Sequence, residues 1–403
     1  MALLLRLVAI FTVLISALGA VRAAAGVVVL DNWTPGDVEF TIRQTDGREW
    51  RYTLSHGDLV PIPAAGELGI TFESDGRPCH QVMQANTICC FAGREKHLEL
   101  AELKPPLVEG NAAAEAKPGP AARGAPASHP AAPTDPILTI PVMIFADSNE
   151  PLAQAPWEKQ IRARLADASK IFEHHCRVRF EPAAAGRWQT DPHVFVFGKS
   201  LDEFMTHASV KPPARIAIGF TSRYQWVPGE VHLGGTRGPF FPYILIRNAM
   251  PGVSEPERLE VLVHELGHYL GAVHVPHSTS VMRPILGDQK SRLRSFRIRF
   301  DGPNTLAMYL VAEEMRIHPI TSLSQLSPER KAALRGVYAA IIQAMPKDST
   351  AQEYLTMLNG GVPGMQPAPP PRAPGTRSFL PPSADRRASY PSGTWPPGMS
   401  HPG

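Results

Sequence analysis

Short runs of β-branched and aromatic residues, separated by turn signals, characterise the first quarter of the chain. Four such runs lie at residues 27–30, 38–42, 50–54 and 68–72. Dipeptides such as Asp46-Gly47 and Asp75-Gly76 mark turns near them. Regularly spaced short strands of this kind indicate a β-sandwich or a small barrel. We therefore predict a small all-β domain over residues 25–104. Since it carries no binding motif, an accessory or spacer role is its plainest interpretation.

Strand-like and helix-like patterns alternate between residues 137 and 345. Apolar runs predict strands at 137–145, 178–180, 194–197, 215–220 and 243–246. Residues 157–175 place apolar side chains on one helical face, and further helices are expected at 304–316 and from Ser327 onward. Ser254 and Glu257 have the spacing of a capping box, which predicts the start of another helix. This order indicates a second domain, of mixed α+β class, over residues 137–345.

Composition divides the chain further. With 403 residues, of which 43% are hydrophobic and 19% charged, the protein can bury at least one full core. A net charge of +3 is too small to indicate nucleic acid or an acidic membrane as a partner. Many of the 42 prolines fall in two stretches that cannot bury enough apolar surface to fold. We predict a Pro/Ala-rich linker at 105–136 and a Pro-rich disordered tail at 346–403.

The N-terminus has the pattern of a signal peptide over residues 1–24. Arg6 precedes an apolar run at 7–20, and small residues for cleavage follow at 21–23. An uncleaved membrane anchor is the alternative, but the run is short for a membrane span. The sequence therefore predicts export, with a secreted, periplasmic or cell-envelope location and no membrane span after cleavage.

One segment carries recognisable chemistry. Residues 264–274 read HELGHYLGAVH, and residues 280–284 read SVMRP. His264 and His268 are four residues apart, so a helix presents both imidazoles to one ion. Gly271 can take a left-handed conformation that ends the helix and lets His274 return as a third ligand. Three imidazoles leave one tetrahedral position for water, which is typical of a catalytic zinc site.

This segment resembles the signature H-E-x-x-H-x-x-G-x-x-H of metzincin zinc peptidases, and the Met-turn at Met282 resembles that of the matrixin branch. The resemblance covers residues 137–345. It implies a twisted, mostly parallel five-stranded sheet with an active-site helix and a C-terminal helix. Val275 stands where matrixins usually carry serine. We find no tyrosine placed as an extra ligand after the Met-turn, and no obvious residues for a structural zinc or calcium.

The resemblance also implies an activity, that of an exported zinc-dependent endopeptidase with one catalytic zinc ion. His264, His268 and His274 would hold the ion, and Glu265 would be the general base that acts on a zinc-bound water. Met282 would pack beneath the ion. The alternative is a non-catalytic zinc-binding scaffold or adhesin of the cell envelope that keeps the same fold.

The expected substrate is a protein or peptide that lies extended along an edge strand of the sheet. Residues 215–220 and 230–235 are both candidates for that edge. Arg283, Pro284 and Ile285, directly after the Met-turn, are expected to form the wall of the substrate pocket.

Four cysteines complete the chemistry-bearing residues: Cys79, Cys89, Cys90 and Cys176. In an oxidising compartment, a local disulfide from Cys79 to Cys89 or Cys90 is expected. The alternative for Cys79 is a thiolate that binds the zinc and keeps the enzyme latent, since residues 77–79 faintly resemble the matrixin propeptide motif.

Overall fold

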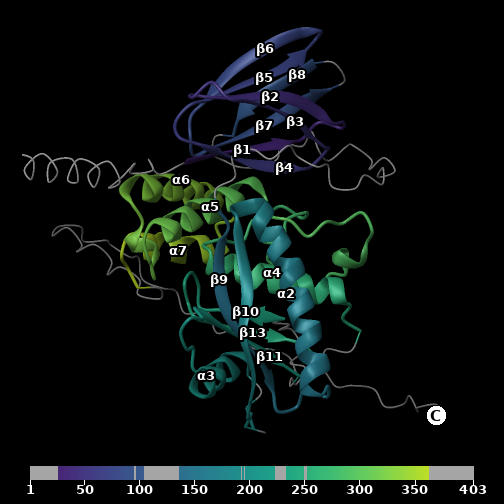
Figure 1. The fold of residues 1–403 in the computed structure, drawn as a ribbon, viewed down its shortest axis with the longest axis vertical. Coiled ribbons are helices and arrows are strands. Elements are labelled where there is room, and N and C mark those ends of the chain that lie inside the picture. The colour runs from purple at the N-terminus through teal and green to yellow at the C-terminus, as the bar shows by residue number, and fades with distance from the viewer. Residues whose placement is uncertain are drawn as a thin grey trace, which may run out of the picture. The chain divides into compact units, whose positions relative to one another are not determined.

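The computed structural model describes residues 26–94, 97–103, 136–191, 193–194, 196–222, 233–248 and 252–362. The predicted signal peptide and nearly all of the predicted linker lie outside the described residues, as does the chain after 362. The described chain is a mixed α+β structure with three β-sheets (Figure 1). None of its helices is long and apolar enough to cross a membrane.

The residues before 104 form two four-stranded sheets, with strand orders β4-β1-β7-β8 and β3-β2-β5-β6. The strands are β1 (Gly26–Asn32), β2 (Val38–Gln44), β3 (Glu49–Leu54), β4 (Leu59–Ala64), β5 (Leu68–Ser74), β6 (Arg77–Met83), β7 (Thr87–Arg94) and β8 (His97–Glu102). All four predicted runs are strands, at β1, β2, β3 and β5. Strand β4 was not predicted because it contains Pro61 and Pro63, which are tolerated since β4 is an edge strand.

Strand β1 is buried on both faces. Val28 and Leu30 point into the core between the two sheets, whereas Val27 and Val29 belong to the larger core that contains the helices. This alternation follows from the two-residue period of a strand. Arg297 adds an ion pair to Asp58 at 2.6 Å. The sandwich therefore packs more closely on the rest of the chain than a spacer requires.

The third sheet has the strand order β10-β9-β11-β13-β12. Its strands are β9 (Leu138–Asp147), β10 (Val178–Trp188), β11 (Ile216–Thr221), β12 (Gly234–Gly235) and β13 (Tyr243–Arg247). The first four strands in this order run parallel, and β12 is antiparallel to β13. Figure 1 shows β9, β10, β11 and β13 side by side.

One strand prediction and one of the two edge-strand candidates in this part of the chain are wrong. Strand β11 lies between β9 and β13 and is buried along its whole length, so residues 215–220 cannot form an edge. The edge strand is β12, within the other candidate range, of which residues 230–232 lie outside the described residues. Of the predicted strand at 194–197, Phe195 lies outside the described residues, Val194 and Val196 are not in a strand, and Phe197 begins the helix α3 (Phe197–His207).

The other α-helices of the described chain are α2 (Gln154–Cys176), α4 (Glu255–Tyr269), α5 (Gly302–Ile317), α6 (Pro328–Ala344) and α7 (Thr350–Leu358). The predicted capping box is confirmed, since Glu257 Oε2 accepts a hydrogen bond from the backbone nitrogen of Ser254 at 2.7 Å. The prediction of a disordered tail from residue 346 is wrong for α7. Tyr354 and Leu358 are buried in the main core. They are four residues apart, as on one face of a helix, but the prolines that follow led us to predict disorder for the whole segment.

The predicted disulfide is also absent. All four cysteines are free thiols. Cys79 lies on β6 in one sheet of the sandwich and Cys89 on β7 in the other, where its Sγ is 3.3 Å from Met83 Sδ. Burial raises the pKa of the Cys176 thiol to about 12, which keeps it protonated.

Candidate metal centre

The three predicted histidine ligands lie together. His264 and His268 project from α4, and their Nε2 atoms are 3.0 Å apart. Gly271, with a φ of +89°, turns the chain after the helix and brings His274 back toward them. The ligand atoms of the three residues all lie within 4.8 Å of one another, so this group could hold a metal ion.

Each imidazole is held through its Nδ1 atom. His264 Nδ1 donates to the carbonyl oxygen of Val281 at 2.8 Å, and His268 Nδ1 donates to that of Ala272 at 3.0 Å. His274 Nδ1 contacts Asp348 Oδ2 at 2.8 Å. Because these oxygens accept, the proton sits on Nδ1 and the Nε2 lone pair is left for an ion.

The protonation of the first two imidazoles suits a metal ligand. Burial, followed by the charge of His274, lowers the pKa of His264 to about 3. Burial and the neighbouring histidines lower the pKa of His268 well below its ordinary value. Both rings are therefore neutral at neutral pH, and only the neutral imidazole binds a metal.

Side chains from α5 and α6 fix the turn that carries His274. The amide of Asn304 accepts from the backbone nitrogen of Val273 at 2.8 Å and donates to its carbonyl oxygen at 3.0 Å. The hydroxyl of Tyr338 donates to the carbonyl oxygen of Gly271 at 2.8 Å. Both side chains are fully buried. We did not predict these roles, because asparagine and tyrosine inside apolar helices give no sequence signal for a distant contact.

Glu265 lies next to the edge strand and lines the same cavity as the three histidines. It is buried, and burial raises the pKa of its carboxyl group to about 8. A Cβ atom on Gly234 of β12 would lie 2.9 Å from both Cγ and Oε1 of Glu265. The edge strand can therefore approach the carboxylate this closely only because Gly234 has no side chain.

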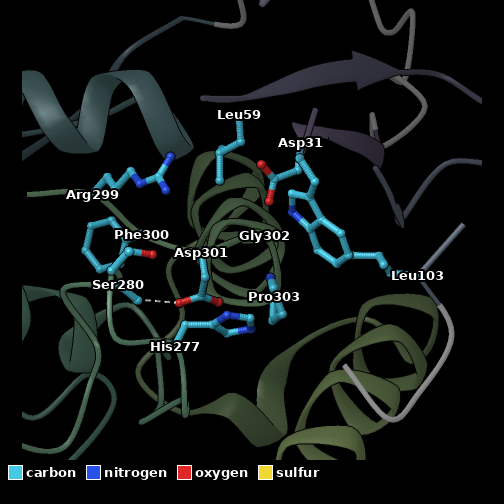
Figure 2. Close-up of a pocket in the computed structure, with 12 residues that line it drawn as sticks. Asp31, Leu59, Leu103, His277, Ser280, Arg299, Phe300, Asp301, Gly302 and Pro303 are labelled. Atoms are coloured by element: carbon cyan, nitrogen blue, oxygen red, sulfur yellow. Dashed lines mark hydrogen bonds between the residues drawn. The ribbon is translucent and has the colours of Figure 1, made fainter. Parts of the chain in front are cut away.

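The Met-turn packs beneath α4. Met282 is fully buried, and a Cβ atom on Gly267 would lie 3.0 Å from its Sδ and 2.8 Å from Cε1 of Phe300. Ser280 Oγ donates to Asp301 Oδ2 at 2.7 Å, a contact drawn in Figure 2, and accepts from the backbone nitrogen of Met282 at 3.0 Å. The turn thus holds Val281 where its carbonyl oxygen meets His264.

A cavity of about 540 Å³ opens over the three histidines. Its lining comprises Leu233, Gly234, Gly235, Thr236, Arg237, Gly238, His264, Glu265, His268, His274, Pro284, Leu286, Thr350, Glu353 and Tyr354. The edge strand, the Met-turn segment and α7 therefore all face the candidate metal centre.

Of the three residues that we expected to form the pocket wall, only Pro284 lines this cavity. Arg283 is buried away from the cavity, where it forms ion pairs with Glu260 at 2.6 Å and Asp288 at 2.8 Å. Ile285 is 71% exposed and does not line the cavity, whereas Leu286 does. Successive residues of an irregular turn point in different directions, so three neighbours in sequence do not form one wall.

A second, smaller cavity of about 30 Å³ is lined in part by His277 and by Ser280, the first residue of the Met-turn segment (Figure 2). Asp31, Trp33 and Leu59 line it from the sandwich, and residues 299–303 line it from the segment that enters α5. It has space for about two water molecules. None of the three histidines lines it, so it is separate from the candidate metal centre.

Comparisons with known proteins give little further information. No family model matches the sequence, and no curated protein is significantly similar to it. The crystal structure of archaemetzincin from Methanopyrus kandleri is similar over 42% of this chain and 93% of that chain, with 17% identity and a TM-score of 0.32. The structure of a chaperone–substrate complex is similar over 72% of this chain and 43% of that chain, with 10% identity and a TM-score of 0.30. Scores this low support no assignment.

Proposed function

We propose that this protein is an exported, zinc-dependent endopeptidase of the metzincin type. The observation that carries the proposal is the convergence of three imidazoles next to a buried carboxylate. His264, His268 and His274 offer ligand atoms within 4.8 Å of one another, and Glu265 lines the same cavity. A scaffold that only binds metal has no need for a carboxylate in this place.

The donor set fits zinc. Three imidazoles with their Nδ1 atoms next to oxygen acceptors form a ligand set that is common in catalytic zinc sites. The cavity next to them leaves room for water and substrate. When bound, zinc supplies Lewis-acid activation of water and of the scissile carbonyl group.

The chain's own residues have two further roles in this proposal. Glu265 takes a proton from the attacking water and passes it to the leaving amine, as a general base and then a general acid. The edge strand β12 pairs with β13 on one side, at Gly234 with Ile246 and at Gly235 with Leu245. On its other side, the backbone of an extended peptide can add as a further strand next to Glu265.

The test is cleavage of an unfolded protein by the full-length chain and its Glu265→Ala variant. Glu265 is not a ligand in this proposal, so the variant should bind one zinc ion per chain while cleavage falls about 10²- to 10⁴-fold. Glu329→Ala, at an exposed position in the first turn of α6, is the control and should cleave like the wild type. A chelator should abolish wild-type cleavage, and added zinc should restore it.

Two results would contradict the proposal. Full cleavage by Glu265→Ala would remove the general base from the mechanism. A wild-type protein that binds zinc but cleaves none of a broad peptide library would favour the alternative, a zinc-binding scaffold of the cell envelope.

A further inference from the structure

We propose that Asp348 is a positioning residue that sets the orientation of the third imidazole and thereby the metal affinity of the centre. The inference rests on the proposed metal site but goes beyond its motif, because Asp348 lies 74 positions after His274. It concerns the segment formed by residues 348–354, which precedes and begins α7.

Asp348 uses its two carboxylate oxygens for two different purposes. Oδ2 accepts a hydrogen bond from His274 Nδ1 at 2.8 Å, and Oδ1 accepts one from the backbone nitrogen of Thr350 at 3.0 Å. Thr350 Oγ1 lies 3.2 Å from the same His274 Nδ1. The carboxylate is therefore held in place by the start of α7 and holds the imidazole in turn.

His274 needs this support more than the other two histidines do. His264 and His268 are buried on a regular helix, whereas His274 follows a turn and its side chain is 21% exposed. Their acceptors are neutral carbonyl oxygens, of Val281 and Ala272. Asp348 is the one charged acceptor among the three. A carboxylate fixes the ring and makes it a stronger ligand than a neutral oxygen does.

The same contact links the metal centre to α7. Asp348 joins His274 to the first residue of the helix, and one turn later the hydroxyl of Tyr354 lies 3.4 Å from the carbonyl oxygen of His268. If Asp348 couples the position of His274 to that of α7, zinc binding must stabilise α7. Loss of Asp348 must then weaken both zinc binding and the stabilisation of α7. Such coupling is reciprocal by thermodynamic necessity.

The experiment measures zinc affinity of the full-length chain by competition with a chromophoric chelator. Asp348→Ala should weaken zinc binding about 10- to 100-fold. Asp348→Asn keeps a neutral acceptor for His274 Nδ1, so its zinc affinity should fall less than that of Asp348→Ala. The matched control is Asp75→Asn, which removes the carboxylate that contacts His97 Nδ1 at 2.8 Å on the sandwich. This control should bind zinc like the wild type.

A second measurement separates positioning from general stability. Amide hydrogen exchange over 350–358 should slow when zinc is added to the wild type, and should slow less in Asp348→Ala. The visible spectrum of the Co²⁺-loaded protein should also change in that variant, because the ligand geometry differs.

The outcomes distinguish this inference from the proposed function. Wild-type zinc affinity in both Asp348 variants, with unchanged exchange in α7, would overturn the positioning role even if the protein is a peptidase. Weaker zinc binding in the variants of a protein that cleaves nothing would support the positioning role and overturn the peptidase. A wild-type chain that binds no zinc would overturn both.

Discussion

Two sets of residues meet at the candidate metal centre, and they differ in how they are arranged along the chain. The ligand segment, residues 264–274, contributes three imidazoles and a carboxylate within eleven consecutive positions. The support residues Asn304, Tyr338 and Asp348 lie 30 or more positions later, on or next to three different helices. The ligand segment determines which atoms face an ion, and the support residues determine how firmly the turn holds them.

This difference shows that a short motif can supply all the reactive groups of a site while residues far along the chain hold those groups in place. Without support, Gly271 would leave the turn before His274 free to move, because glycine has the widest conformational range. The support residues remove that freedom through hydrogen bonds to Gly271, Val273 and His274, of which the first two are buried.

The largest expected effect is on the ligand side. His268→Ala removes an imidazole and should weaken zinc binding by more than about 100-fold, which exceeds the effect expected for a residue that only contacts a ligand. Metal content after dialysis and cleavage of an unfolded substrate would both show the loss. His207→Ala, at the exposed end of α3, is the control. Normal zinc content in His268→Ala would mean that the ligand segment is misassigned.

Two helical glycines, Gly267 on α4 and Gly336 on α6, test how tightly the ligand helix packs on the Met-turn. Gly267→Ala on α4 places a Cβ against Phe300 and Met282, which are fully buried, whereas Gly336→Ala on α6 meets nothing within 4 Å. Both variants gain the same helix propensity. The difference in their free energies of unfolding should therefore report the overpacking at Gly267, about 1–3 kcal/mol. Equal stabilities in urea denaturation would show that the Met-turn does not pack tightly beneath the ligand helix.

Tyr338→Phe tests one support residue without changing shape. The variant leaves the carbonyl oxygen of Gly271 without its donor in a buried place, which should cost about 1–2 kcal/mol. Chemical denaturation of the metal-free protein measures the cost, and zinc competition shows whether the looser turn weakens the site. If stability and affinity both match the wild type, the turn is held by Asn304 and Asp348 alone.

Met282→Leu should have the smallest effect. The two side chains have similar volumes, so the free energy of unfolding should change by less than about 1.5 kcal/mol and the zinc stoichiometry should stay at one. Thermal denaturation and metal analysis provide the check. Loss of zinc from this variant would mean that the sulfur atom acts on the ion itself, which packing alone does not explain.

The sequence predicted the elements and the ligand segment better than the surroundings of the site. Strands and helices with strong periodicity, such as α2, β11 and α4, were found because each buries one face or its whole length. The convergence of His264, His268 and His274 followed from helical spacing and one glycine. The support residues could not be predicted, because their partners are determined by how α5, α6 and α7 pack. The position of the Arg283 side chain could not be predicted for a similar reason, since its ion pair with Glu260 depends on how the Met-turn packs against α4.

The packing of strand β1 on the rest of the chain predicts how the protein behaves after cleavage between the sandwich and the third sheet. Val27 and Val29 are buried in the core that also contains α5, so the sandwich is attached by apolar packing as well as by the chain that connects it. A protease that severs the connection between residues 103 and 136 leaves this packing intact. The two fragments should therefore migrate together under native conditions and separate only in denaturant.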